Sequence, residues 1–372
     1  MNRAFLYCIY PTKEQEQKLW NTFGCCRFVY NHYLSRQKER YEKGQKHLSR
    51  TDCNNDCNRI LKKDYPWLRE VDKFALTNAI YALDAGYQRF FKKQGGYPRF
   101  KSRHRSRTSY TTNFTNGNIK IFEDMIQLPK LGKVRAVIHR KADNLWNIKQ
   151  ATIVMERDGS FYVSVLYAYE AEIIPIGVCY NKVLGLDYKS DGLYMDSEGK
   201  CAHMPHFYRM NQKKLAKAQW KQKHKVIGSK NYEKQKHKIA KIHRKSANQR
   251  KDFLHKQSTE IANRYDMVCI EDLNMRSMSN QGFRNGKATL DNGYGMFTSM
   301  LAYKLADRGK QLVVVDKWYP SSKTCSRCGS VKEISLEQRR YICKCGMNLD
   351  RDLNAAINIR KKGYEMYWQM AA

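Results

Sequence analysis

Residues 325–359 read CSRCGSVKEISLEQRRYICKCGMNLDRDLNAAINI and place four cysteines directly before a short acidic segment that opens a helix. Cys325 and Cys328 form a C-x-x-C pair, and Cys343 and Cys345 form a tighter C-x-C pair after fourteen intervening residues. Four thiolates can complete the tetrahedral shell of a structural Zn²⁺ ion, and a glycine behind each pair allows the tight backbone turn. The spacing therefore predicts a structural zinc site.

Three acidic residues occupy positions where side chains from distant segments can meet. Asp187 ends the apolar strand LGLD, Glu271 ends the apolar strand VCIE, and Asp352 follows the strand LVVVD at the start of the last helix. Three carboxylates can hold two divalent ions about 4 Å apart, one to activate the attacking water and one to stabilise the leaving oxygen of a phosphodiester. Because hard oxygen ligands suit Mg²⁺, the pattern predicts a magnesium-dependent site.

Other acidic residues compete for these roles. Asp191 and Asp196 belong to a hairpin turn and its exposed face, and Asp272 should point away from the preceding glutamate because side chains alternate along a strand. Asp350 is the strongest rival of Asp352, since one of the two can cap the helix. The residues alone leave both choices for the third ligand open.

The charge of the chain indicates the class of its partner. The 372 residues include 69 Lys and Arg against 35 Asp and Glu, a net charge of +34. Such an excess opposes a compact fold unless a polyanion shares the surface, and nucleic acid is the usual polyanion. Twenty-five tyrosines add flat rings that can stack on bases.

The apolar segments are too short for a membrane protein. No run reaches the ~18 apolar residues of a membrane span, and the run before Pro11 is too short for a signal peptide. Twelve cysteines without a secretion signal favour a reducing cytosol and metal binding over disulfides. We therefore expect a cytoplasmic protein with no membrane partner.

Apolar periodicity divides the first half of the chain into segments of different type. Residues 3–10 read as a strand, residues 12–93 as helices that open with a Thr-x-x-Gln capping box, and residues 118–170 as alternating strands. A small β-barrel split by a helical insertion is the simplest arrangement of these segments.

The second half alternates strands and helices. Strands are expected within 182–200, at 267–273 and at 310–318, with a polar loop at 279–294 and a helix at 295–309. A chain of this length should form two or three domains, so the predicted class is multidomain α/β plus β.

Two strongly basic segments are candidates for contacting a phosphate backbone. Residues 99–107 carry basic residues at alternate positions, which an extended strand would place on one face. Residues 209–257 hold 17 Lys and Arg and 2 acids, a net charge of +15, and read as two helices joined at Gly228. The candidate contacts are Arg99, Lys101, Arg103, Arg105, Arg107, Lys213, Lys214, Lys217, Lys221, Arg244, Lys245 and Arg250.

Taken together, these segments resemble the TnpB (OrfB) family, the insertion-sequence nucleases related to type V CRISPR effectors. The resemblance covers nearly the whole chain. It rests on YPTKEQ, Gly24 and RFVYN near the N-terminus, GGYPRFK (95–101), GLDY (185–188), SANQRKDFLHK (246–256), CIEDLNM (269–275), YPSSKTCSRCG (319–329) and DRDLNAAINI (350–359).

The resemblance implies a fold of four parts. An RNase H-like (RuvC-type) nuclease domain would hold an inserted zinc ribbon, and an N-terminal wedge β-barrel would be interrupted by a helical recognition module. The corresponding residues are 1–11 and 94–180 for the wedge barrel, 12–93 for the helical module, 181–320 and 347–372 for the nuclease domain with basic helices at 209–257, and 321–346 for the ribbon.

The resemblance also implies an activity. Family members use a guide RNA copied from the transposon end, recognise a short motif beside the target, open double-stranded DNA and cut it with Mg²⁺. The family's metal-binding acids match Asp187, Glu271 and Asp352. The resemblance also implies a prokaryotic, cytoplasmic protein that is associated with the nucleoid when bound to DNA. The C-x-C pair and the Tyr-Lys-Ser after Asp187 depart from the family pattern, but neither removes a ligand, so an active nuclease is expected.

Two other functions compete with this one. A single-strand transposase would need a His-hydrophobic-His pair, and the ten histidines contain none; His203 and His206 are three apart. A metal-dependent transposase acting directly on transposon ends would use the same acidic trio and stays an alternative. A nuclease-inactive, RNA-guided DNA-binding repressor predicts a lost acid, whereas all three are present.

Overall fold

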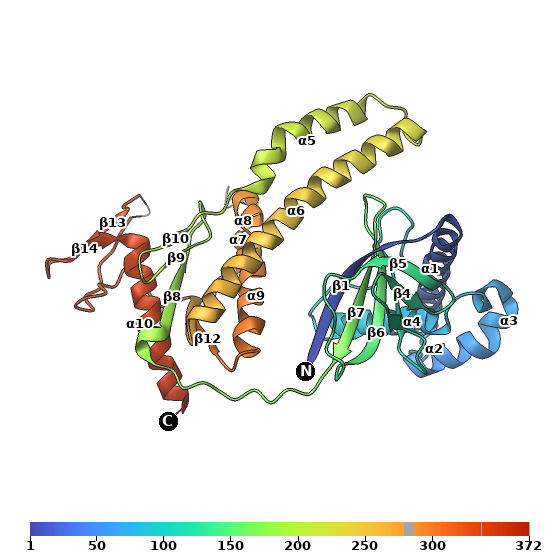
Figure 1. Ribbon diagram of the computed structural model, residues 1–372, viewed down its shortest axis with the longest axis horizontal. Coiled ribbons are helices and arrows are strands. Elements are labelled where there is room, and N and C mark those ends of the chain that lie inside the picture. The colour runs from blue at the N-terminus through green and yellow to red at the C-terminus, as the bar shows by residue number, and fades with distance from the viewer. Residues whose placement is uncertain (279–285, 336, 372) are drawn as a thin grey trace. The chain divides into compact units, whose positions relative to one another are not determined.

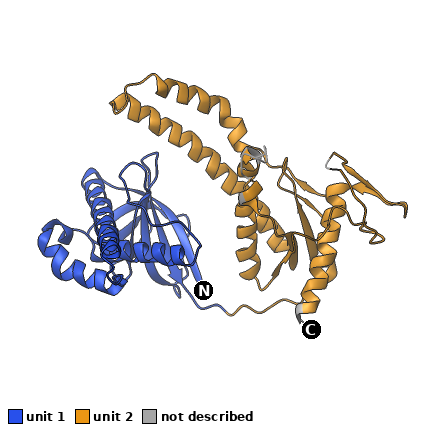
Figure 2. Ribbon diagram, turned by 180° about the vertical axis from the view of Figure 1, so that it is seen from behind, with its two compact units in different colours: residues 1–171 blue, residues 172–372 orange. Residues whose placement is uncertain are grey.

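The computed structural model describes residues 1–278, 286–335 and 337–371, and the chain divides into two compact units, residues 1–171 and 172–372 (Figure 2). Across the described residues, no helix combines the length and the apolar character needed to cross a membrane. Each unit has its own sheet and core.

Unit 1 is built on a seven-stranded antiparallel sheet (Figure 1). Its strands are β1 (Asn2–Tyr10), β2 (Thr108–Asn113), β3 (Lys120–Ile121), β4 (Met125–Leu128), β5 (Gly132–Val137), β6 (Asn147–Met155) and β7 (Phe161–Ala168), in the order β2-β6-β7-β1-β5-β4-β3. Alternate residues of β7 are buried, which is the pattern of a strand with one face on a core.

The helices of unit 1 are inserted between β1 and β2. They comprise α1 (Lys13–Glu42), α2 (Arg50–Asp56), a π-helical turn (Cys57–Leu61), α3 (Lys62–Asp64), a 3₁₀ turn (Pro66–Arg69) and α4 (Lys73–Phe91). The predicted capping box is confirmed, because the Thr12 hydroxyl accepts from the Gln15 N–H and the Gln15 side chain accepts from the Thr12 N–H. Residues of the helices and of the sheet, such as Leu34, Leu76 and Val163, share one hydrophobic cluster.

The prediction of a strand at residues 99–107 is wrong. Residues 103–105 form a turn, and the strand starts only at Thr108. The cause is local hydrogen bonding: the Ser102 hydroxyl accepts from the Arg105 N–H at 3.0 Å, and the Ser106 hydroxyl accepts from the Ser102 N–H at 2.9 Å. Serine side chains that bond nearby backbone groups favour turns over strands.

Unit 2 contains a five-stranded mixed sheet. Its strands are β8 (Val183–Tyr188), β9 (Tyr194–Asp196), β10 (Cys201–Ala202), β11 (Met267–Glu271) and β12 (Gln311–Val315), in the order β10-β9-β8-β11-β12. The strands β8, β11 and β12 are parallel, and β9 and β10 extend the sheet antiparallel. The strands predicted in this half of the chain are thus present.

Helices cover both faces of this sheet (Figure 1). The helical elements of unit 2 are a 3₁₀ turn (Tyr180–Lys182), α5 (Phe207–Lys223), α6 (Lys230–Arg264), α7 (Met275–Met278), α8 (Gly286–Asn292), α9 (Tyr294–Ala306) and α10 (Arg351–Ala371). One apolar cluster joins the sheet to α6 and α9, and a second joins it to α10 through Ile359. The two basic helices predicted at 209–257 are α5 and α6, with Gly228 at a positive φ of 83° in the turn between them.

The polar loop expected at 279–294 is only partly described. Residues 279–285 lie outside the described residues, and residues 286–292 form α8 rather than loop. The helix is anchored through Asp291, whose side chain accepts from the Tyr208 N–H and pairs with Arg250. Tertiary contacts of this kind override the weak helix propensity of a Gly- and Asn-rich sequence.

The ribbon before α10 is a two-stranded hairpin, β13 (Arg340–Ile342) with β14 (Asn348–Asp350). Behind it, α10 lies unusually close to the sheet. A Cβ atom on Gly185 would lie 2.1 Å from the carbonyl oxygen of Ala356, so only glycine fits there. This approach sets the start of α10 beside the carboxyl end of β8.

Candidate metal centre

The carboxylates of Asp187, Glu271 and Asp352 come from three elements that meet at one edge of the unit 2 sheet. Asp187 lies near the carboxyl end of β8, and Glu271 is the last residue of the neighbouring parallel strand β11. The pairing of Leu186 with Ile270 makes Asp187 and Glu271 neighbours across the two strands. Asp352 lies in the first turn of α10, which packs against β8.

The electrostatics of Asp187 show how closely these groups interact. Burial, together with the negative charges of Glu271 and Asp352, raises the pKa of Asp187 well above its ordinary value, and Arg351 and Lys189 oppose this effect. Burial also raises the pKa of Glu271, and a hydrogen bond from Ser321 counters it. Clustered carboxylates whose charge is this costly suit a bound cation.

Two cations of the chain already lie beside the trio. The Lys189 ammonium is 3.5 Å from Asp352 Oδ2, and an Arg351 guanidinium nitrogen is 3.6 Å from Asp352 Oδ1. All three side chains are largely buried, with 21%, 15% and 15% of the Lys189, Arg351 and Asp352 side chains exposed. Sequence reasoning did not select Lys189 or Arg351, although both stand within two residues of a predicted ligand.

Asp350 and Asp352 differ in their contacts. Asp350 is exposed, and its Oδ1 accepts from the N–H groups of Asp352 and Leu353 at 2.9 and 3.1 Å. This is the bonding of a helix N-cap residue. The Asp350 carboxylate therefore serves α10, and it is the charge of Asp352 that reaches Asp187.

The other rivals do not face the trio. Asp196 is buried, but its Oδ1 accepts from the N–H groups of Glu198 and Lys200 and so closes the turn after β9. Asp191 and Asp272 are exposed. The exposed Asp191 lies in a turn as the sequence indicates, whereas Asp196, expected on an exposed face, is buried because its carboxylate accepts these two backbone N–H groups.

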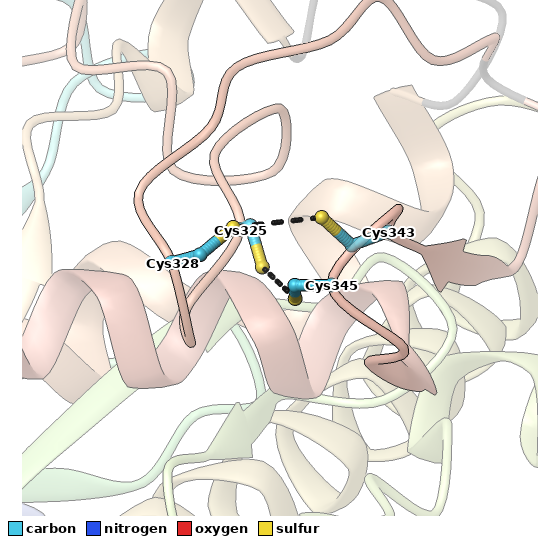
Figure 3. A group of neighbouring side chains, drawn as sticks. All are labelled: Cys325, Cys328, Cys343 and Cys345. Carbon is cyan, nitrogen blue, oxygen red and sulfur yellow. Dashed lines mark hydrogen bonds between the residues drawn. The ribbon is translucent and has the colours of Figure 1, made fainter.

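The four cysteines of the ribbon form a second, tighter group (Figure 3). All four sulfur atoms lie within 4.8 Å of one another, with 3.7 Å between those of Cys325 and Cys345 and 3.6 Å between those of Cys328 and Cys343. A tetrahedral shell with Zn–S bonds of about 2.3 Å separates its sulfurs by about 3.8 Å. The donor set and its spacing therefore fit a structural zinc ion, and the shortened C-x-C pair does not prevent this.

The four-cysteine group depends on turns at two glycines. Gly329 and Gly346 follow the two pairs with φ of +75° and +83°, values that residues with a Cβ rarely adopt. In the described parts of the chain, this is the only group of three or more potential ligands that is drawn together so closely. The pair Cys53 and Cys57 is buried on α2 and the turn after it, within the hydrophobic core of unit 1.

Most of the basic residues selected from the sequence face solvent. Arg99, Arg103, Arg105 and Arg107 are exposed in unit 1, and Lys213, Lys214, Lys217, Lys221 and Lys245 are exposed on the α5–α6 hairpin. The two helices of the hairpin lie side by side (Figure 1), held by hydrogen bonds such as that from Gln235 Nε2 to the Ala218 carbonyl oxygen. Arg244 is half-buried.

Two of the selected residues are placed differently from the expectation. The Lys101 ammonium lies 4.0 Å from the centroid of the Tyr30 ring, and burial lowers its pKa. Arg250 pairs at 2.9 Å with Asp291, whose side chain is only 1% exposed. Both cations stabilise the fold of their own unit, so we withdraw them as phosphate contacts. A sequence does not show such pairing, because their partners lie 71 and 41 residues away.

Three sequence families match the chain. Residues 1–46 match an OrfB-associated family described as "Helix-turn-helix domain", residues 167–281 match the OrfB family described as "Probable transposase", and residues 294–359 match "Cas12f1-like, TNB domain".

Curated relatives match over nearly the full length. The chain is 34% identical to a "Putative RNA-guided DNA endonuclease" of Streptomyces pristinaespiralis, over 98% of this chain and 90% of the relative. It is 31% identical to "Putative RNA-guided DNA endonuclease InsQ" of Escherichia coli K12, over 97% of this chain and 92% of the relative. TnpB-like protein L79 of Acanthamoeba polyphaga mimivirus is 34% identical over a shorter stretch, 35% of this chain and 26% of the relative.

Solved structures share the fold. The protein in a Cas12f1–sgRNA–target DNA complex superposes with a TM-score of 0.52 at 14% identity, covering 97% of this chain and 98% of that one. The mini-RNA-guided endonuclease CRISPR-Cas_phi3 gives a TM-score of 0.51 at 11% identity, covering 97% and 92%. With the full-length sequence relatives, these matches show that the chain belongs to the TnpB (OrfB) family, which is related to the type V CRISPR effectors.

Proposed function

We propose that this chain is an RNA-guided DNA endonuclease that hydrolyses a phosphodiester at Asp187, Glu271 and Asp352 with Mg²⁺. The observation that carries the proposal is the placement of Asp187 and Glu271 at the carboxyl ends of adjacent parallel strands and of Asp352 in the first turn of the helix packed on β8. Burial, and then the charges of Glu271 and Asp352, raise the pKa of Asp187 there. The names of the full-length relatives support RNA guidance and DNA as the target. The net charge of +34 supports nucleic acid as the partner.

We assign the parts of the fold as follows. Unit 2 supplies the RuvC-type nuclease domain, residues 181–320 and 347–372, and residues 321–346 form its zinc ribbon. The unit 1 sheet is the wedge domain, residues 1–11 and 94–171, and residues 12–93 are the helical recognition module. Residues 172–180, which the sequence assigned to the wedge barrel, belong to unit 2. Parallel strands covered by helices on both faces, with acids at the carboxyl ends of β8 and β11, support the nuclease assignment.

The residues of the centre prepare it for phosphate chemistry. A divalent ion bound by the trio would polarise the phosphodiester and stabilise the developing negative charge. Asp187 and Glu271 are held by adjacent strands, so their carboxylates are positioned by the sheet and not by a loop. Lys189 and Arg351 hold Asp352 and offset part of the negative charge, which limits repulsion among the carboxylates before an ion binds.

The exposed basic residues are the proposed path of the nucleic acid. On the α5–α6 hairpin, Lys213, Lys214, Lys217, Lys221 and Lys245 would follow the phosphates of the guide–target duplex, with Arg244 beside them. In unit 1 the turn of Arg99, Arg103, Arg105 and Arg107 would do the same. Such contacts read the shape of the duplex, while base pairing with an RNA copied from the transposon end reads its sequence.

The experiment that tests the function begins with sequencing the RNA that co-purifies with the protein. We expect one defined RNA that ends in variable flanking sequence, and cutting of double-stranded DNA that matches this end only with Mg²⁺ or Mn²⁺. Random cellular RNA, or cutting that ignores the RNA sequence, would contradict the proposal. Cutting at the transposon ends without any RNA would instead favour a transposase.

The catalytic assignment has its own test. Asp187→Ala should reduce cutting below detection because it removes the central ligand, while RNA binding stays at the wild-type level. Asp191→Ala is the matched control, since Asp191 is exposed in the turn after β8. Undiminished cutting by Asp187→Ala would exclude the trio as the catalytic site.

A further inference from the structure

One hydroxyl group contacts the candidate metal centre from outside the three predicted ligands. Ser321 Oγ donates a short hydrogen bond to Glu271 Oε1. Ser321 is only 5% exposed, so the bond is shielded from water. It lies in the segment between β12 and the first cysteine pair, at the root of the ribbon. The Glu271 carboxylate is therefore oriented by a residue of the ribbon root.

The ribbon root is itself fixed by two asparagines of α10. Asn358 Nδ2 donates to the carbonyl oxygens of Ser321 at 2.8 Å and Thr324 at 2.7 Å. Asn354 Nδ2 donates to the Thr324 carbonyl oxygen at 2.8 Å, and Asn354 Oδ1 accepts from the Ser326 N–H at 2.9 Å. Both asparagines are buried, at 0% and 3% exposure.

The spacing of these asparagines explains why they act together. Residues four apart on a helix lie on the same face one above the other, so Asn354 and Asn358 form one polar strip. The same helix carries Asp352 in its first turn. One helix thus supplies a carboxylate of the trio and holds the residue that orients a second carboxylate.

We propose that Ser321 is a positioning residue for Glu271, and that Asn354 and Asn358 hold it through the ribbon root. The inference rests on the proposed function, because it concerns the use of Glu271 as a metal ligand. A carboxylate that accepts a fixed hydrogen bond through one oxygen presents the other in a defined direction. Removing such a partner typically costs about 10- to 100-fold in metal affinity or activity.

The chain offers a matched set of variants. Ser321→Ala removes the donor, and Ser321→Thr keeps a hydroxyl at the same position. Ser322→Ala is the control, since Ser322 is the next residue and its hydroxyl makes no hydrogen bond to any residue that the structure describes. Asp187→Ala identifies ions that bind elsewhere on the protein or on its RNA.

The first measurement is the rise in the thermal unfolding midpoint of the RNA-bound full chain as Mn²⁺ is added. A ligand that binds only the folded state raises this midpoint with a dependence set by its affinity. The rise in unfolding midpoint of Asp187→Ala is first subtracted from that of each other protein. After this correction, Ser321→Ala should need about 10- to 100-fold more Mn²⁺ than the wild type to reach half of its maximal rise in unfolding midpoint. Ser322→Ala and Ser321→Thr should follow the wild type. Without added Mn²⁺, the wild type, Ser321→Ala, Ser321→Thr and Ser322→Ala should unfold at similar temperatures.

The second measurement is the cutting rate against Mg²⁺ concentration, in which Ser321→Ala should show the same shift. A wild-type Mn²⁺ response in Ser321→Ala would overturn the inference while leaving the proposed function intact. A defect in Ser321→Thr as large as that in Ser321→Ala would also overturn it, because the loss would then come from packing. A wild-type protein with no Asp187-dependent Mn²⁺ response would refute the metal centre and this inference with it.

Discussion

Asp187 illustrates how a residue can serve a site at the expense of the fold. Its pKa is raised because burial and the charges of Glu271 and Asp352 disfavour the ionised form. An acid that holds its proton more tightly in the folded chain destabilises that chain as the pH rises above the unfolded pKa of about 3.9. Without bound metal, the raised pKa of Asp187 therefore lowers the stability of the fold at neutral pH.

We predict that Asp187→Asn unfolds at a higher temperature than the wild type at pH 7 in buffer without added divalent ions. The gain should be largest near neutral pH, because the raised pKa of Asp187 lowers the stability of the wild type there. It should shrink as the pH falls toward 4, since the wild-type carboxyl is then protonated. Thermal unfolding at several pH values checks this, with the exposed Asp191→Asn as the control. A gain that does not depend on pH would point to packing instead of charge.

The two aspartates at the start of α10 should separate stability from catalysis. Asp350→Ala removes an N-cap and should cost about 0.5–2 kcal/mol of stability while cutting persists. Asp352→Ala should abolish cutting, and its effect on stability is the balance of relieved repulsion within the trio and of two lost ion pairs, to Lys189 and Arg351. Unfolding midpoints and cleavage rates of both variants provide the measurement. A folded Asp350→Ala protein that does not cut would reverse the assignment.

The sequence identified the candidate metal ligands, but it did not identify the residues that contact them. Asp187, Glu271 and the cysteines stand out because each follows an apolar strand or shows a ligand spacing. The choice between Asp350 and Asp352 could not be made from the residues alone, because it depends on the direction of two side chains in one helical turn. The contact of Ser321 with Glu271 could not be predicted from the sequence either, since Glu271 lies 50 residues earlier in the chain.

Among the elements, the ribbon is the one least able to fold by itself. Its hydrophobic cluster comprises Cys325, Tyr341, Cys343 and Met347, so two of the four buried residues are proposed zinc ligands. Small modules with so little apolar surface depend on the metal for their folding energy. The ribbon should therefore lose structure when zinc is removed, while the unit 2 sheet keeps its own two apolar clusters.

We predict that a zinc-selective chelator, or Cys343→Ser, makes residues 321–346 the first segment cut by a protease. The main thermal transition should remain, and about one zinc ion per chain should be found before chelation. Metal analysis and mass spectrometry of the fragments provide the measurement. Cys179→Ser is the control, since Cys179 is exposed and lies outside the ribbon. A protein without zinc whose ribbon resists proteolysis would refute the zinc assignment.

Elements with a clear apolar period were predicted well, and elements fixed by polar contacts were not. The strands β8, β11 and β12 follow from apolar runs that the sequence displays, whereas α5 and α6 were predicted from a run of basic residues divided at Gly228. The strand prediction for residues 99–107 was wrong because the hydroxyl groups of Ser102 and Ser106 stabilise a turn. The loop prediction for residues 286–292 was wrong because contacts of Asp291 to α5 and α6 stabilise a helix there. Alternation of charge alone did not indicate a strand.

For the whole molecule, the excess of positive charge is the property that affects binding most. With a net charge of +34, electrostatic attraction to phosphates should dominate affinity for RNA and DNA. The pairing of Arg250 with Asp291 and the burial of Lys101 show that not every cation contributes to that attraction. The contribution of a segment therefore depends on how many of its cations reach solvent.

The α5–α6 hairpin is the segment on which this can be measured. Lys213, Lys214, Lys217 and Lys221 are exposed on α5, and their replacement by alanine lowers the net charge from +34 to +30. If all four neutralise phosphates, the slope of log affinity against log salt should fall by about 3 to 4, at about 0.9 per contact with duplex and 0.7 with single strands. Replacing the same four lysines by arginine keeps the charge and should keep the slope. An unchanged slope in the alanine variant would show that the guide and target do not follow α5, and the proposed path of the duplex would then have to be abandoned.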